Sequence, residues 1–99
     1  MKETEELAEV FKVLSDTTRL RLMKLLIENE GPLCVNALAD TLGVTQSAVS
    51  QHLRVLRQMG MVHGQRYGYH VHYSLDQGRL EECKRLFLET LGGESSFAE

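Results

Sequence analysis

The chain has 99 residues, of which 42% are apolar and 25% charged, with a formal net charge of −3. This length suits one domain, and the composition is that of a soluble globular protein rather than a disordered one. No apolar run approaches the ~18 residues of a membrane span, and the acidic start is no signal peptide, so we expect a cytoplasmic protein. A lone copy this short buries only roughly 60–65% of its unfolded surface, which favours dimerisation.

Two helices are predicted in the first third of the chain. An i, i+3, i+4, i+7 apolar stripe marks the first, and it comprises Leu7, Val10, Phe11 and Leu14. Ser15 or Asp16 can cap the second helix, because a short oxygen-bearing side chain accepts from its free N–H groups. The second helix runs to about Glu28 and is apolar nearly all round, so we expect it in the middle of the fold.

Two further helices, joined by a tight turn, are predicted next. Asn36 can cap a short helix over residues 37–42, which stops at Gly43, and Thr45 then caps a longer helix that ends at Gly60. The turn has the residue types of a helix-turn-helix. Its small and apolar positions, which let the two helices approach closely, are Ala39, Gly43 and Val49.

The apolar period changes from 3.6 to 2 at about residue 61, which predicts a β-hairpin. Residues 61–66 and 69–75 form its strands around a turn at Tyr67-Gly68. Tyr69 belongs to the same every-second-residue set as the apolar residues of the second strand, so we expect it to pack under the hairpin. A last helix over residues 79–91 follows, and we expect a domain over 1–93 with a flexible tail over 94–99.

Charge is unevenly distributed along the chain. Residues 41–75 contain no Asp or Glu, although they contain three arginines and all four histidines. A stretch of 35 residues without a carboxylate spares an approaching phosphate backbone local repulsion. This part of the chain is therefore the candidate nucleic-acid surface despite the negative net charge.

The outward face of the longer helix and the hairpin tip carry groups that suit DNA. Amides and hydroxyls pair with base edges, and guanidinium groups bind guanine or phosphate. An ordinary solvated helix of this size would instead mix Glu and Lys. The candidate DNA-binding residues are Thr45, Gln46, Ser47, Ser50, Gln51, His52, Arg54, Arg57, Arg66 and Tyr67. Arg66 is the expected hairpin contact, on a phosphate or in a narrow minor groove.

Four segments resemble the ArsR/SmtB family of repressors. They are residues 14–20 (LSDTTRL), 42–53 (LGVTQSAVSQHL), 54–62 (RVLRQMGMV) and 73–75 (YSL). The resemblance extends from about Leu7 to Leu91. It implies a mainly α winged helix-turn-helix with four helices, a β-hairpin and a fifth helix.

The resemblance also implies a homodimer built from the first and last helices. Such a dimer binds an inverted-repeat operator without ligand and is released when an inducer binds. The apolar stripes of these two helices suit that dimer independently, since the helix-turn-helix does not need them. The candidate dimerisation residues are Leu7, Val10, Phe11, Leu80, Phe87 and Leu91. Two-fold symmetry would place the recognition helices about 34 Å apart, one DNA turn.

The metal sites common in this family look absent, and we expect no cofactor. A Cys-Val-Cys pattern is reduced here to Cys34-Val35-Asn36, and an Asp-x-His pair is replaced by Gln77-Gly78-Arg79. One thiolate cannot hold a soft metal as three do. Cys34 and Cys83 remain candidates for a redox pair if the fold brings them together, although inert apolar roles are the simpler interpretation. His70 and His72 share one side of a strand, but zinc needs at least one more ligand.

Two other functional classes compete with DNA binding. An enzyme is disfavoured because the chain lacks a Gly-rich phosphate loop, a nucleophile elbow and a carboxylate pair in a plausible pocket. A winged helix used only for protein contacts is the stronger alternative. It would show acidic or apolar residues on the outward face of the longer helix, which has neither.

Overall fold

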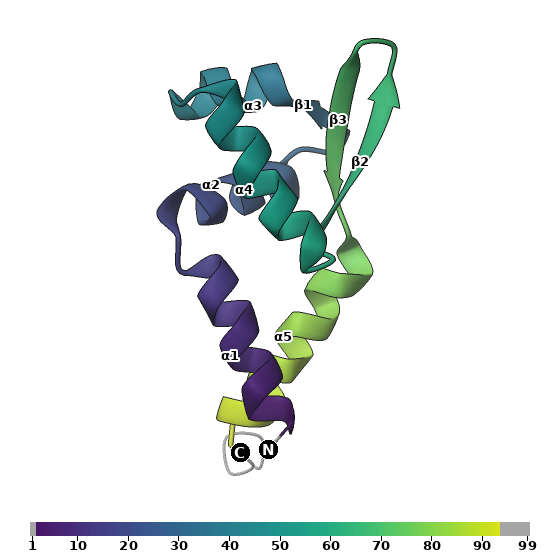
Figure 1. The fold of residues 1–99 in the computed structure, drawn as a ribbon. Coiled ribbons are helices and arrows are strands. Elements are labelled where there is room, and N and C mark those ends of the chain that lie inside the picture. Colours follow the sequence, from purple (N-terminus) through teal and green to yellow (C-terminus); the bar gives the residue numbers. More distant parts are fainter. Residues whose placement is uncertain (1, 94–99) are drawn as a thin grey trace.

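The computed structural model describes residues 2–93, and it contains five helices and three short strands (Figure 1). The helices are α1 (Lys2–Leu14), α2 (Thr17–Glu28), α3 (Val35–Leu42), α4 (Gln46–Gln58) and α5 (Gln77–Leu91). The strands are β1 (Leu33–Cys34), β2 (Val62–Tyr67) and β3 (His70–Leu75). This is the predicted mainly α winged helix-turn-helix, with one more strand than expected. Within residues 2–93, none of the helices combines the length and the apolar composition that a membrane span requires.

The two ends of the molecule are formed by different helices and strands (Figure 1). Helices α1 and α5 lie side by side at one end, where the rings of Phe11 and Phe87 meet edge to face with centroids 6.0 Å apart. Helices α3 and α4 and the β2–β3 hairpin form the other end. The first and last helices thus pack against each other within the chain, at the end opposite α3 and the hairpin.

The core lies where α2, α3 and α4 meet. Leu22, Leu38 and Leu53 are fully buried there, as are Val49 and Leu56 of α4. Helix α2 is central, as predicted, but its apolar side chains are not all buried. Leu20 and Ile27 are about half exposed, because only one face of α2 meets α3 and α4.

The three strands form an antiparallel sheet in the order β1-β3-β2. Strand β1 was not predicted, because two residues show no periodicity; Leu33 pairs with Tyr73 and Cys34 with His72. The predicted hairpin turn was one residue early. Tyr67 pairs with His70, so the two-residue turn is Gly68-Tyr69.

Helix caps agree with the sequence at two positions and differ at a third. Asp16 caps α2 by accepting from the Arg19 N–H, and Thr45 caps α4 by accepting from the Ala48 N–H. The predicted Asn36 cap was wrong. Helix α3 begins at Val35, and the Cys34 Sγ accepts from the Ala37 N–H at 3.4 Å. The helix begins there because Cys34 pairs with β3 and is the last residue of the extended segment.

Helix α5 begins two residues earlier than predicted, at Gln77, with Asp76 as its cap. The Asp76 carboxylate accepts from the Arg79 N–H at 2.8 Å. The predicted flexible tail over 94–99 lies outside the described residues, and so does Met1.

Candidate DNA-binding surface

The turn between α3 and α4 has the geometry that its residue types predict. Gly43 adopts a left-handed conformation with φ +68°, and its N–H caps α3. Ala39 is buried against α4, and Val49 is fully buried on the facing side. This close contact fixes the angle of α4, which we call the recognition helix.

The predicted base-reading side chains share the outward face of α4. The exposed ones are Gln46, Ser47, Ser50, Gln51, Arg54 and Arg57, and Thr45, which is also exposed, lies just before α4 as its cap. The opposite face buries Val49, Leu53 and Leu56, which holds the helix in place. Polar donors and acceptors without any carboxylate are therefore presented together on a rigid element.

His52 is the exception among the predicted residues of α4. It is half-buried, and its Nδ1 lies 4.0 Å from the Asp16 carboxylate at the start of α2. The pKa of Asp16 is lowered chiefly by the hydrogen bond from the Arg19 N–H, and the nearby His52 lowers it further. His52 therefore contacts α2, and its ring is less available to a groove than its neighbours.

The β2–β3 hairpin, which we call the wing, projects away from α1 and α5 (Figure 1). Arg66 and Tyr67 are both exposed near its tip, as predicted. The Tyr67 ring also packs edge-on against His72, with centroids 5.0 Å apart. The expectation that Tyr69 packs under the wing was wrong. Tyr69 is 97% exposed, because it lies in the turn beyond the last strand pair.

Two links that the sequence analysis missed hold the wing and α4 against α5. His63 Nε2 lies 2.6 Å from the Asp76 carboxylate, which joins β2 to the α5 cap. The pKa of Asp76 is lowered first by the Arg79 N–H and then by His63. Arg79 donates from Nε to the main-chain oxygen of Met59. The only sequence signals for these links were Asp76, a polar residue just after a strand, and Arg79, an arginine in the first turn of a helix.

Five of the six predicted dimerisation residues, all but Leu91, line one apolar groove between α1 and α5, with a volume of about 390 Å³. Leu7 and Val10 are buried in its floor within the single chain, whereas Phe11 and Phe87 are over 40% exposed. Leu80 also lines the groove, and Leu91 is exposed near the end of α5. Leu7 and Val10 thus join α1 to α5, whereas the exposed side chains of Phe11, Phe87 and Leu91 can contact another surface.

The two cysteines occupy separate environments and form no disulfide. Cys34 is half-buried at the cap of α3, whereas Cys83 is buried on α5 with its Sγ 4.0 Å from the sulfur of Met61. Burial raises the pKa of Cys83, which keeps it a thiol. Among residues 2–93 no three His, Cys, Asp or Glu side chains are grouped so as to hold a metal ion, and His70 and His72 are included in that statement.

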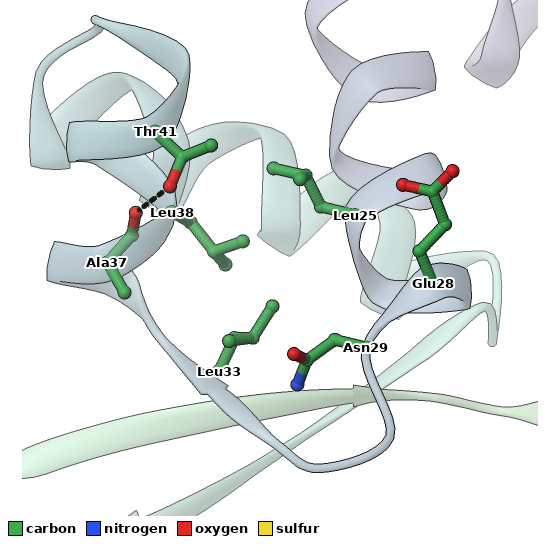
Figure 2. Close-up of a pocket in the computed structure, with 7 residues that line it drawn as sticks. All are labelled: Leu25, Glu28, Asn29, Leu33, Ala37, Leu38 and Thr41. Atoms are coloured by element: carbon green, nitrogen blue, oxygen red, sulfur yellow. Dashed lines mark hydrogen bonds between the residues drawn. The ribbon is translucent and has the colours of Figure 1, made fainter.

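A small pocket of about 220 Å³ opens between α2 and α3 (Figure 2). Leu25, Leu33 and Leu38 point into it, and polar groups stand at its rim. The rim groups are already engaged: Thr41 donates to the Ala37 oxygen and Asn29 to the Gly31 oxygen. The pocket therefore offers apolar surface but few free polar groups to orient a ligand.

Comparison with known proteins agrees with this geometry. The family model described as "Bacterial regulatory protein, arsR family" matches residues 16–63, which include α2 to α4. An HTH-type transcriptional regulator of Methanocaldococcus jannaschii is 37% identical over 86 residues, which are 87% of this chain and 96% of that protein.

Two further comparisons extend the match. A transcriptional repressor SmtB homolog of Synechocystis sp. is 44% identical over 75 residues, or 76% of this chain, and the match spans only 55% of that relative. The solved structure of an ArsR-like transcriptional regulator from Rhodococcus sp. has a TM-score of 0.76 at 30% identity, and the match covers 97% of this chain and 88% of that one. The chain therefore belongs to the arsR family of bacterial regulatory proteins, which are DNA-binding transcriptional regulators rather than enzymes.

Proposed function

We propose that this protein is a transcriptional repressor that binds an inverted-repeat operator as a homodimer. The observation that carries the proposal is the carboxylate-free outward face of α4 together with the exposed wing. In this proposal Gln51 and Arg54 read base edges and Arg66 binds a phosphate or the minor groove, and the exposure of all three side chains supports these roles. Because its partner is genomic DNA, the cytoplasm is the compartment in which we expect it to act.

The homodimer is proposed from the apolar groove between α1 and α5. Phe11, Phe87 and Leu91 leave large apolar surfaces in water at the end opposite the wing. A second copy that covers them would bury this surface and place two recognition helices on one side of a duplex. Named relatives are repressors, which supports repression as the outcome of binding.

Binding to the operator is proposed to need no cofactor, because the residues of the family's metal patterns are replaced in this chain. The signal that releases DNA is proposed to be a separate inducer. Oxidation of Cys34 is one candidate, whereas the buried thiol of Cys83 is a poor target.

A salt titration tests DNA binding against a purely protein-binding role. The purified chain is mixed with a labelled duplex recovered by selection from random sequence, and affinity is measured at rising salt, with and without EDTA. A DNA-binding protein loses affinity steeply as the salt concentration rises, because counterion release drives binding. We expect that steep loss, and no effect of EDTA. Absence of binding to any duplex at low salt would overturn the proposal.

A further inference from the structure

The wing tip presents an aromatic ring that packs on nothing within the protomer. Tyr69 is 97% exposed, whereas the other exposed large apolar side chains of the described residues are between 43% and 59% exposed. It follows Gly68, whose φ of +65° suits the first central position of a type II′ turn. Small polar residues such as Asn, Asp and Ser also occur at the second position. Turn geometry therefore does not explain the ring.

The residues next to Tyr69 at the wing tip differ from it in chemistry and in contacts. Arg66 and Tyr67 are successive strand residues, so their side chains lie on opposite faces of the ribbon. The Tyr67 ring is engaged by His72. Tyr69 is then a solvent-exposed ring in the turn that follows these two residues, at the end of the hairpin farthest from α1 and α5 (Figure 1).

We propose that Tyr69 is the uncharged DNA contact of the wing. Its ring packs against a deoxyribose beside the minor groove that flanks the site read by α4, and its hydroxyl donates to a phosphate oxygen. A tyrosine suits this place because it has an apolar body and a polar end, and tyrosine hydroxyls are among the side chains that bond phosphates. The inference rests on the proposed DNA binding and adds a contact to it.

DNA is the occupant that the surroundings of Tyr69 favour. Residues 41–75 contain no carboxylate, so a polyanion meets no repulsion from this segment, and Arg66 is a near neighbour in sequence. The tip also lies at the same end of the molecule as the start of α4 (Figure 1). The apolar groove proposed for a second copy lies at the opposite end.

The absence of charge on Tyr69 makes its contribution separable from that of Arg66. A cation displaces counterions from DNA, so its loss lowers the slope of log affinity against log salt by about one. A neutral ring displaces none. Removing it should lower affinity by the same factor at every salt concentration.

The first experiment compares variants on the selected duplex across a salt series. We expect Tyr69→Ala to bind about tenfold more weakly with an unchanged slope, and Tyr69→Phe to lose about threefold. Arg66→Ala should reduce the slope, and Ile27→Ala, which trims an exposed side chain on α2, should bind like wild type. Circular dichroism confirms folding of each variant.

Two outcomes would overturn the inference while leaving DNA binding intact. One is wild-type affinity in Tyr69→Ala, and the other is a slope change as large as that of Arg66→Ala. Failure of the wild-type chain to bind any duplex would instead refute the proposed function itself.

A second measurement reports contact directly. The chain has no Trp, so Tyr69→Trp introduces a single tryptophan at the tip. Acrylamide, a neutral quencher, should quench its emission efficiently in the free protein. We expect saturating duplex to reduce that quenching several-fold, and unchanged quenching in the complex would overturn the inference.

Discussion

Arg79 donates a hydrogen bond from Nε to the main-chain oxygen of Met59, 3.0 Å away, and so joins the start of α5 to the end of α4. Its Nη1 also lies 3.3 Å from Glu82 and 3.7 Å from Glu6 of α1. The carbonyl at the end of α4 lies beyond its helical hydrogen bonds, so this donor replaces water there. One side chain thus links the recognition helix to both helices of the proposed dimer interface.

Replacing Arg79 should therefore weaken the fold and the placement of α4. We expect Arg79→Ala to cost about 2 kcal/mol of unfolding free energy, the usual worth of a hydrogen bond to a charged group. Arg79→Lys should recover only part, since an ammonium lacks the planar fork. Urea unfolding measures both. Arg85→Ala, an exposed arginine on the same helix, is the control, and equal stability of Arg79→Ala and Arg85→Ala would contradict the assignment.

Gln51 and Arg66 should affect DNA binding in different ways. Gln51→Ala should reduce discrimination between the selected duplex and a scrambled one by about 1–3 kcal/mol, because it removes a base-edge contact. Arg66→Ala should weaken binding to both duplexes by a similar factor, because a phosphate contact carries no sequence information. Competition binding measures the ratio, and small equal effects of both changes would refute the proposed docking.

Gly64 permits the close approach of β2 to the ring of Tyr73. A Cβ at this position would lie 2.9 Å from Tyr73 Cε1, so the ring would have to move. We expect Gly64→Ala to cost about 1–3 kcal/mol, as overpacking usually does. Gly31→Ala is the matched control, because an added Cβ there meets no atom within 4 Å. Thermal unfolding compares the two, and a neutral Gly64→Ala would show that the wing shifts freely.

Asp76 should make stability depend on pH in the acid range. Its pKa is lowered from 3.8, first by the Arg79 N–H and then by His63, so the folded state favours the carboxylate. That stability is complete above the unfolded pKa and is lost as pH falls through the lower folded pKa. Asp76→Asn keeps a capping acceptor but no charge. It should be less stable than wild type around pH 6, and the difference should close on acidification.

Melting temperatures between neutral and strongly acidic pH test this sign. The Asp16 carboxylate, whose pKa is also lowered, remains in the variant, so some acid sensitivity should persist. A difference between the Asp76→Asn variant and wild type that grows as pH falls would contradict the prediction.

The proposed dimer predicts a specific effect at the end of α5. Leu91 is 59% exposed in the single chain, so Leu91→Glu should fold as a monomer. A buried unpaired charge at the interface should shift the monomer–dimer equilibrium strongly toward monomer and weaken operator binding. Sedimentation velocity measures this. Leu20→Glu, at a half-exposed position on α2 away from α1 and α5, should leave the association state unchanged.

Much of the fold could be predicted because the sequence features that specify its helices and turns are local. The apolar stripes of α1, the caps at Asp16 and Thr45 and the left-handed Gly43 each depend on residues within a few positions of one another. Some predictions failed by one or two residues at element ends, as in the hairpin turn and the start of α5, and others failed because a partner distant in sequence intervenes. Asn36 has the better capping side chain, but pairing of Cys34 with His72 sets where the helix begins.

The order of the five helices and of the β2–β3 hairpin, the helix-turn-helix and the carboxylate-free segment could all be inferred from the sequence, because helix and strand periods, caps and charge are properties of neighbouring residues. Four features emerge only from the folded chain: the short strand β1, the hold of Arg79 on the end of α4, the contact of His63 with Asp76 and the exposure of Tyr69 to solvent. These outcomes depend on which distant segments pack together and on a one-residue shift in the turn. Such a shift changes which side chain lies on the sheet and which lies beyond it.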